Sequence, residues 1–115
     1  MSKIKYSIHE GELIVNGKEI KLPYPAEEAL IFQDILIVRV EPAIGKIYNR
    51  NVFALLANGE IKWQISESPH GTEADKPYMN IYLSKDGKLI AGNWNGVDYF
   101  VGIVDGSIIA SSFKK

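Results

Sequence analysis

The sequence predicts an all-β fold: an antiparallel meander of about ten short strands, arranged as a sandwich, an open barrel or propeller-like sheets. Four Asn-Gly or Asp-Gly pairs separate runs of apolar and β-branched residues, and such pairs accept the positive φ angles of a type I′ hairpin turn. The flanking runs alternate apolar and polar residues, as half-buried strands do. Residues 25–30 have the best helical pattern in the chain, and they are long enough for one turn at most.

Each turn pair lies between two expected strands. In chain order, the paired runs are 12–15 with 18–22, 52–57 with 60–65, 78–84 with 88–94, and 97–104 with 107–112. Residues 35–40 form a further apolar run, and Glu10-Gly11 and Gln33-Asp34 are weaker turn candidates. Irregular, polar stretches at 41–49 and 66–77 are expected to be loops, and a loop as long as the second is usually functional or mobile.

Two of these runs predict particular burial. In 60–65, Ile61, Trp63 and Ile65 share one face, so Trp63 is expected in the core. In 97–104 apolar residues lie on both faces, which indicates a central strand covered on both sides.

Composition limits the function classes. The 115 residues suit a single domain over 1–115, and 46% hydrophobic with 23% charged residues is ordinary for a globular protein. Thirteen Lys and Arg against fourteen Asp and Glu give a net charge of −1, without the basic excess of a nucleic-acid binder. The absence of cysteine excludes thiol catalysis, thiolate zinc sites and disulfides.

The chain also lacks an apolar run of signal-peptide or membrane-spanning length. We therefore expect a soluble, cytoplasmic protein that contacts neither membrane nor nucleic acid.

Two parts of the sequence are similar to each other. A shift of 47 residues places Asn58-Gly59-Glu60-Ile61 on Asp105-Gly106-Ser107-Ile108 and Phe53 on Phe100. Each unit reads as strand, loop, strand, Asn/Asp-Gly, strand, and over residues 35–112 it resembles a propeller blade of the quinoprotein-like type. Two units cannot close a ring of four or more blades. Either the chain dimerises to supply more blades, or the internal similarity reflects meander geometry alone.

Few residues suit catalysis. His9 ends the first expected strand and is expected on the surface, whereas His70 lies in the long loop near Glu67, Glu73 and Asp75. One imidazole with two carboxylates can bind a divalent metal, but this spacing matches no established motif, so a solvated loop is the preferred interpretation. A nucleophile elbow and a phosphate-binding loop are both absent. We expect no enzyme activity, no bound metal and no cofactor.

Aromatic and acidic residues are better candidates for binding. Trp94 lies in the polar turn 93–96, where it either anchors an interface or caps the core. Tyr24, Tyr48 and Tyr99 also lie at or near strand ends. The acidic residues of the long loop, joined by Glu41 and Asp98, either present a negative patch to a basic partner or form a solvated face.

A small, cysteine-free, all-β domain with one long acidic loop is similar in general profile to the bacterial immunity proteins that neutralise toxins of contact-dependent inhibition and related polymorphic systems. The resemblance implies a cognate toxin domain, bound so that its active site or an adjacent surface is occluded. The predicted partner-binding residues are Glu67, Glu73, Asp75 and Trp94. Two alternatives remain: a small-ligand-binding or scaffold module with propeller-like repeats, and a small metal-assisted enzyme using His70. Edge strands also leave a homodimer open.

Overall fold

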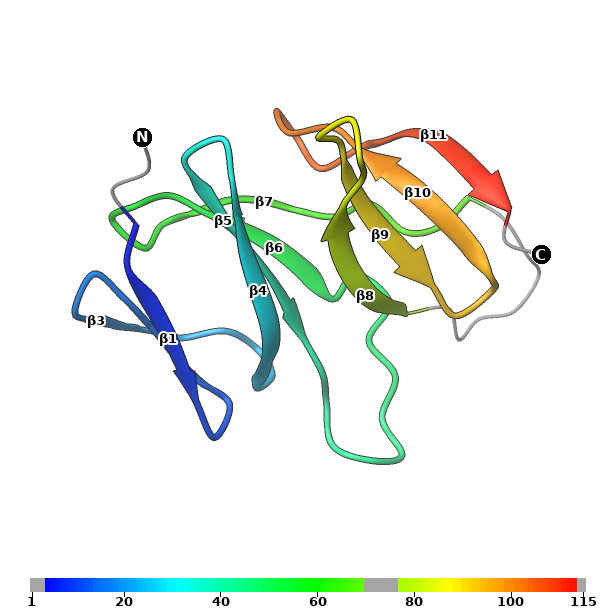
Figure 1. The fold of residues 1–115 in the computed structure, drawn as a ribbon. Helices are drawn as coiled ribbons and strands as arrows, with labels where there is room; N and C mark the ends of the chain where they lie inside the picture. The colour runs from blue at the N-terminus through cyan, green and yellow to red at the C-terminus, as the bar shows by residue number, and fades with distance from the viewer. Residues whose placement is uncertain (1–3, 70–76, 114–115) are drawn as a thin grey trace.

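The computed structural model describes residues 4–69 and 77–113, and this part of the chain forms eleven strands and no helix (Figure 1). All the paired strands are antiparallel. The strands are β1 (Tyr6–His9), β2 (Glu12–Val15), β3 (Lys18–Ile20), β4 (Ala26–Phe32), β5 (Ile35–Val40), β6 (Val52–Leu55), β7 (Ile61–Gln64), β8 (Tyr78–Leu83), β9 (Leu89–Asn93), β10 (Val97–Val101) and β11 (Ile108–Phe113). The predicted all-β meander is confirmed, with one strand more than expected.

The helical turn considered for residues 25–30 is wrong, because β4 runs through this segment. β4 pairs with β5 from Ala26 opposite Val40 to Phe32 opposite Ile35. β5 is buried along its whole length, and a buried strand must have its backbone groups paired. Pairing with β5 therefore overrides a weak local preference for helix.

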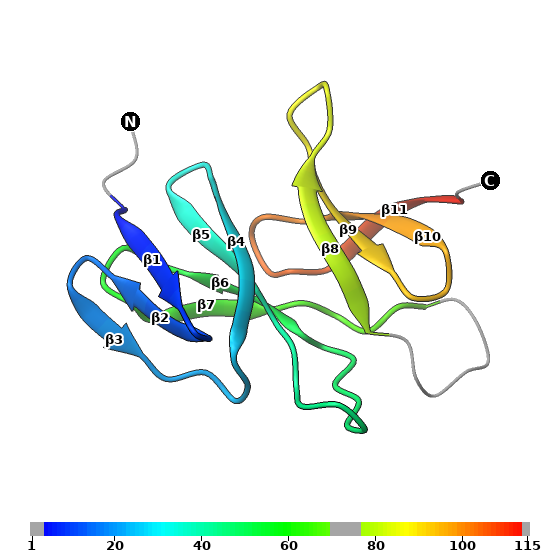
Figure 2. The ribbon, with the colours of Figure 1, turned by 60° about the horizontal axis from the view of Figure 1, so that its bottom comes forward.

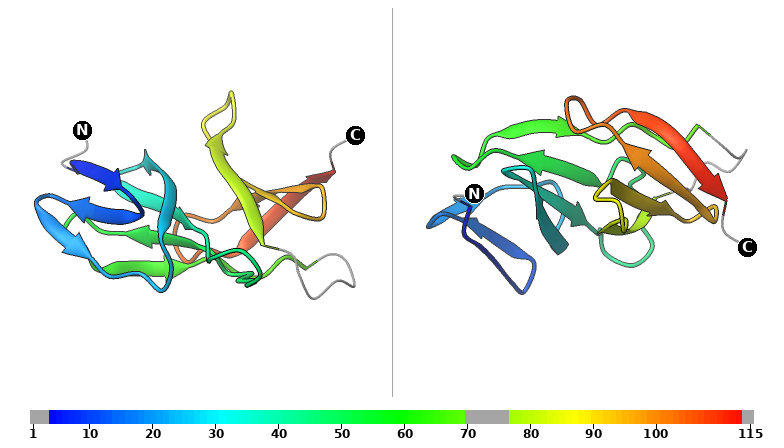
Figure 3. Two further views of the ribbon diagram at one scale, coloured as in Figure 1. Left: turned by 90° about the horizontal axis from the view of Figure 1, so that it is seen from below. Right: turned by 45° about the horizontal axis from the view of Figure 1, so that its top comes forward.

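The strands form three sheets, each a simple meander. Their orders are β1-β2-β3, β4-β5-β6-β7 and β8-β9-β10-β11. The sheets follow one another across the molecule, with the β4–β7 sheet in the middle (Figures 2 and 3). None of the three closes into a barrel. The architecture is therefore compatible with a sandwich-like meander.

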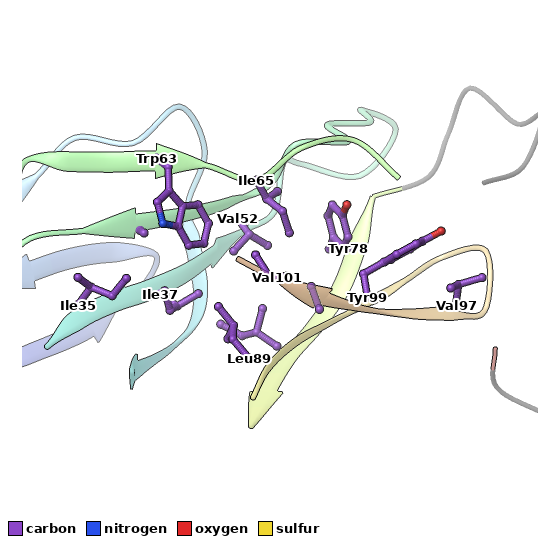
Figure 4. Packing of buried hydrophobic residues seen from close by; sticks show 13 residues of the cluster. Ile35, Ile37, Val52, Trp63, Ile65, Tyr78, Leu89, Val97, Tyr99 and Val101 are labelled. Carbon is purple, nitrogen blue, oxygen red and sulfur yellow. The ribbon is translucent and has the colours of Figure 1, made fainter. Parts of the chain in front are cut away.

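Two hydrophobic clusters lie on the two faces of the middle sheet. Successive residues of a strand point to opposite faces, so β5 contributes Ile35 and Ile37 to one cluster and Leu36, Val38 and Val40 to the other. The first cluster joins the middle sheet to the last sheet, with Trp63, Tyr78 and Tyr99 among its members (Figure 4). The second cluster joins the middle sheet to the first through residues such as Leu13 and Val15.

The expected burial of Trp63 is confirmed at 6% exposure, and Ile65 is fully buried beside it. Ile61 departs from the prediction at 51% exposure, because the pairing of β6 with β7 shifts register between Ala54 and Leu55. β10 is a central strand between β9 and β11, as expected. Only one of its faces packs into a hydrophobic cluster, through Val97, Tyr99 and Val101, so the expected cover on both sides is not found.

The predicted hairpins all form, but the turn types differ from those expected. Of the four glycine-containing pairs, Asn16-Gly17 has a positive φ at both residues, as a type I′ turn requires. The weaker candidates Glu10-Gly11 and Gln33-Asp34 also have it. Asn58-Gly59 has a positive φ at the glycine alone, as do the two Asp-Gly pairs at 86–87 and 105–106. In these longer loops glycine supplies the single left-handed residue.

The two similar sequence segments occupy equivalent positions in two sheets. Asn58-Gly59 joins β6 to β7, and Asp105-Gly106 joins β10 to β11; each is the link between the third and fourth strands of a four-stranded meander. A propeller blade has this strand order.

Candidate functional site

A hollow of about 520 Å³ lies between the β5–β6 loop, the start of β8 and the β9–β10 turn. We call it the Trp94 groove. The β5–β6 loop projects beyond the sheets close to the start of β8 in two views (Figures 1 and 2). The groove is lined mainly by apolar and aromatic side chains: Pro42, Ala43, Ile44, Ile47, Tyr48, Pro77, Tyr78, Met79 and Trp94, with Glu41, Lys46 and Asn51.

Four large apolar side chains around this groove are exposed. The exposed fractions are 105% for Ile44, 64% for Trp94, 51% for Ile47 and 43% for Met79. Single exposed apolar residues are common on protein surfaces, but several around one hollow indicate an interaction site.

Trp94 is held on a braced turn. Gly96 N–H donates to the Asn93 carbonyl at 3.0 Å, and Trp94 N–H donates to the Pro77 carbonyl at 2.9 Å. The Asn93 side-chain oxygen accepts from Asn95 N–H at 3.1 Å, which further fixes the turn. The sequence left open whether Trp94 caps the core or is an interface anchor, and its exposure shows that it does not cap the core.

Asn51 forms the polar floor of the groove. Its buried side-chain amide donates to the Val40 carbonyl at 3.1 Å and to the Tyr78 carbonyl at 2.8 Å. Its side-chain oxygen accepts from Tyr78 N–H at 2.9 Å. One side chain thus serves as a strand partner for Tyr78 and ties the last sheet to the end of β5.

A second polar network connects the turn that carries Trp94 to residues 66–68. The Asn95 amide donates to Ser68 Oγ at 2.9 Å and to the Tyr99 hydroxyl at 3.0 Å, and these two oxygens are 2.5 Å apart. Ser68 and Tyr99 are buried. Tyr78 lies beside Tyr99 (Figure 4), and its hydroxyl donates to the Ser66 carbonyl at 2.6 Å. These bonds fix the position of the turn relative to residues 66–68.

A smaller hollow of about 380 Å³ adjoins the groove. It is lined by Asn49, Arg50, Gln64 and Glu67, and it shares Ile47 and Tyr48 with the Trp94 groove. Two predicted partner-binding residues, Glu67 and Trp94, therefore line two hollows that share Ile47 and Tyr48. Glu73, Asp75 and His70 lie outside the described residues.

Asp98 does not belong to an exposed negative patch. Asp98 is buried at 8% exposure and accepts a hydrogen bond from the Tyr82 hydroxyl at 2.7 Å. Glu41 lines the groove, but its carboxylate accepts from Arg39 at 2.7 Å. Arg39 also donates to Glu28 at 2.5 Å, so two carboxylates compensate one buried guanidinium. Tyr99 is buried as well, whereas His9 is exposed, as expected.

Sequence reasoning missed Ile44, Ile47 and Met79. A weak signal was present, because Ile44 and Ile47 are apolar residues in a stretch otherwise expected to be a solvated loop. Nothing in the sequence placed that loop beside Met79 or Trp94, which lie more than thirty residues away along the chain.

A family model for a domain of unknown function, DUF7957, matches residues 1–113. The chain belongs to the DUF7957 family. No curated protein matches it. The match spans both hollows and all eleven strands, so the groove belongs to the DUF7957 domain itself.

Two further findings concern the described residues of this DUF7957 domain. At 4–69 and 77–113, no three His, Asp or Glu side chains gather as ligands for a metal ion. These ranges also contain no helix able to cross a membrane.

The buried tyrosines predict a loss of stability in alkali. Burial, followed by the negative charges of Tyr99 and Glu67, raises the pKa of Tyr78 above its usual value near 10. The unfolded state then loses this proton first. The contribution of Tyr78 to stability is therefore constant below about pH 10 and falls above it, by up to about 1.4 kcal/mol per pH unit. A hydrogen bond to Asp98, with a smaller effect of burial, also raises the pKa of Tyr82.

This dependence is measured by urea unfolding of the wild type and Tyr78→Phe between pH 8 and 11. The variant is expected to be less stable at pH 8, because the Ser66 carbonyl loses its donor, but to lose less stability as the pH rises. Equal slopes for the two proteins would show that Tyr78 is not the group responsible.

Proposed function

We propose that this DUF7957 domain is a non-catalytic protein-binding domain whose partner covers the Trp94 groove. The observation that carries the proposal is the gathering of Ile44, Ile47, Met79 and Trp94, all exposed, around one hollow. Covering apolar surface is the main favourable contribution to association. A tryptophan on a fixed turn loses little conformational freedom on binding and is a frequent anchor of interfaces.

The exposure of Ile44 favours a protein over a small molecule. This side chain is 105% exposed, so it stands out from the rim of the groove. A small molecule in the hollow would cover only the part of Ile44 that lines it, whereas a protein surface would cover the groove and its rim together.

A toxin domain neutralised by occlusion is the partner that the sequence profile implies. In such a complex, the groove would take an apolar side chain of the toxin. Glu67, which lines the adjoining hollow, would face a basic group. An exposed charge of this kind contributes mainly to the rate of association and to selectivity.

A small-ligand site is the second candidate, favoured by the size of the groove. A volume of about 520 Å³ lies within the range of ligand pockets, and an apolar wall with one polar amide, Asn51, is a common lining for such a site. A metal-assisted enzyme using His70 is the third candidate, and His70 lies outside the described residues.

The two candidate functions predict that different molecules are retained by the domain in a pull-down experiment. The tagged wild type, incubated with lysate of its own organism, is expected to retain a stoichiometric protein partner. Trp94→Ala should lower the affinity for that partner at least about tenfold, because an anchor residue typically accounts for more than 1.4 kcal/mol.

Ile109→Ala is the matched control, since Ile109 is 67% exposed on β11 outside the groove. Equal retention by Trp94→Ala and the wild type would contradict the proposal. A small molecule retained without protein, and released by Trp94→Ala, would establish the second candidate instead.

A further inference from the structure

The β5–β6 loop forms one wall of the Trp94 groove. The same loop also carries an exposed apolar side chain that is able to fill a groove of this kind. Ile44 and Ile47 both line the groove, and Ile44 is also fully exposed, on a segment that projects beyond the sheets (Figure 1). Each chain therefore presents an apolar knob and an apolar hollow on the same surface.

We propose that this surface pairs with a second copy of the chain about a twofold axis, so that Ile44 of each copy enters the Trp94 groove of the other. An interface of this symmetry uses the same patch twice and must be complementary to itself. A knob and a hollow carried side by side meet that requirement.

The charges around the groove are self-complementary as well. Lys46 and Glu41 both line it, and they have opposite signs. The Glu41 side chain is 48% exposed despite its bond to Arg39. The twofold pairing sets Lys46 of one copy against Glu41 of the other. With a net charge of −1, two copies repel each other only weakly.

The uncovered faces of the two end sheets suit a second copy less well. On the last sheet, the side chain of Asn80 lies over Gly92 next to Asp98, and Asp98 accepts from Tyr82. On the first sheet, Glu12 and Glu19 are exposed beside Ile14, which is 37% exposed. Burying these carboxylates and amides costs free energy that the apolar part of the groove does not require.

Pairing of this kind hides the groove from any other protein. A partner of the kind proposed above must then compete with self-association. The pairing itself does not rest on that proposed function, because it is measured on the purified chain alone.

Sedimentation equilibrium from about 5 to 500 µM is expected to show a reversible monomer–dimer equilibrium for the wild type. Ile44→Asp should raise the dissociation constant at least about a hundredfold, because the apolar contact is lost twice in a symmetric pair. Ile109→Asp is the matched control and should leave the dissociation constant unchanged. Thermal unfolding of both variants shows whether the fold is intact.

Salt dependence tests the charged pair. Added salt should weaken the wild-type dimer, because it screens Lys46 from Glu41. The Lys46→Glu variant should dimerise less at low salt and more strongly as salt is added, because screening then relieves repulsion between carboxylates.

The natural absence of cysteine permits a test of the contact itself. An oxidised mixture of Ile44→Cys and Met79→Cys chains should form the mixed disulfide faster than a mixture of Ile44→Cys and Ile109→Cys chains. Three results would each overturn the proposal: a monomer over the whole concentration range, a dimer that Ile44→Asp leaves intact, or equal rates for the two mixtures. None of them would bear on the binding of another protein.

Discussion

Replacing Asn51 by leucine is expected to lower the free energy of unfolding by about 3–5 kcal/mol. Leucine leaves the Val40 carbonyl and both backbone groups of Tyr78 without the partners that Asn51 supplies at 2.8–3.1 Å. Each unsatisfied buried group costs about 1–3 kcal/mol, and the costs are not fully additive. Urea unfolding measures the loss directly.

The Asn51→Asp variant examines the same bonds with almost no change in volume. A carboxylate there faces two carbonyl oxygens, so the variant should be at least as unstable as Asn51→Leu at pH 7. Because burial favours the protonated acid, its stability should partly recover as the pH falls from 7 towards about 4, where the unfolded carboxyl also takes up its proton.

The exposed Asn58→Asp exchange is the control and should cost under about 1 kcal/mol. A comparable loss in all three variants would show that the floor of the groove does not join the sheets.

Gly106→Ala is expected to cost about 3 kcal/mol or more, because two penalties add. Gly106 has a φ of +74°, and a Cβ atom at this position would lie 2.8 Å from Trp63 Cδ2 and closer still to Cε3. The indole is held in place, because Trp63 Nε1–H donates to the Ile103 carbonyl at 2.7 Å. The ring therefore cannot move away without breaking that bond.

Gly87→Ala separates the two penalties. Gly87 has a φ of +78° and open space where its Cβ would lie, so alanine there meets the backbone penalty alone, about 1 kcal/mol. Urea unfolding of both variants should show the larger loss at Gly106. Equal losses would mean that the turn does not pack on Trp63.

Much of the fold was predictable because its signals are local. Asn16-Gly17 and the two Asp-Gly pairs mark hairpins within a few residues, and the alternation around Trp63 identifies a buried face. β4 was missed because its conformation depends on β5, the strand that it pairs with. The turn types were missed because loop length, as much as the Asn-Gly or Asp-Gly pair, selects the turn.

The site was predictable only in part. Trp94 was identified because a tryptophan in a polar turn is conspicuous, and Glu67 because it belongs to an acidic loop. Met79 and Ile47 become neighbours through the packing of two sheets, which no local pattern records. Asn51 follows an irregular stretch without any signal of burial, yet it is 1% exposed and satisfies backbone groups of two strands.

Site-specific photo-crosslinking tests most directly whether the Trp94 groove is the surface that contacts another protein. A photoreactive phenylalanine derivative replaces Ile44 or Met79 at the groove, or Ile109 or Val104, which are exposed outside it. Each tagged chain is irradiated in lysate of its own organism, and the mass of each adduct separates a second copy from a different protein. The account predicts one different protein joined through positions 44 and 79, in competition with a second copy joined through the same positions, and little of either through 104 and 109. The same protein joined equally through all four positions, or through 104 and 109 alone, would contradict it.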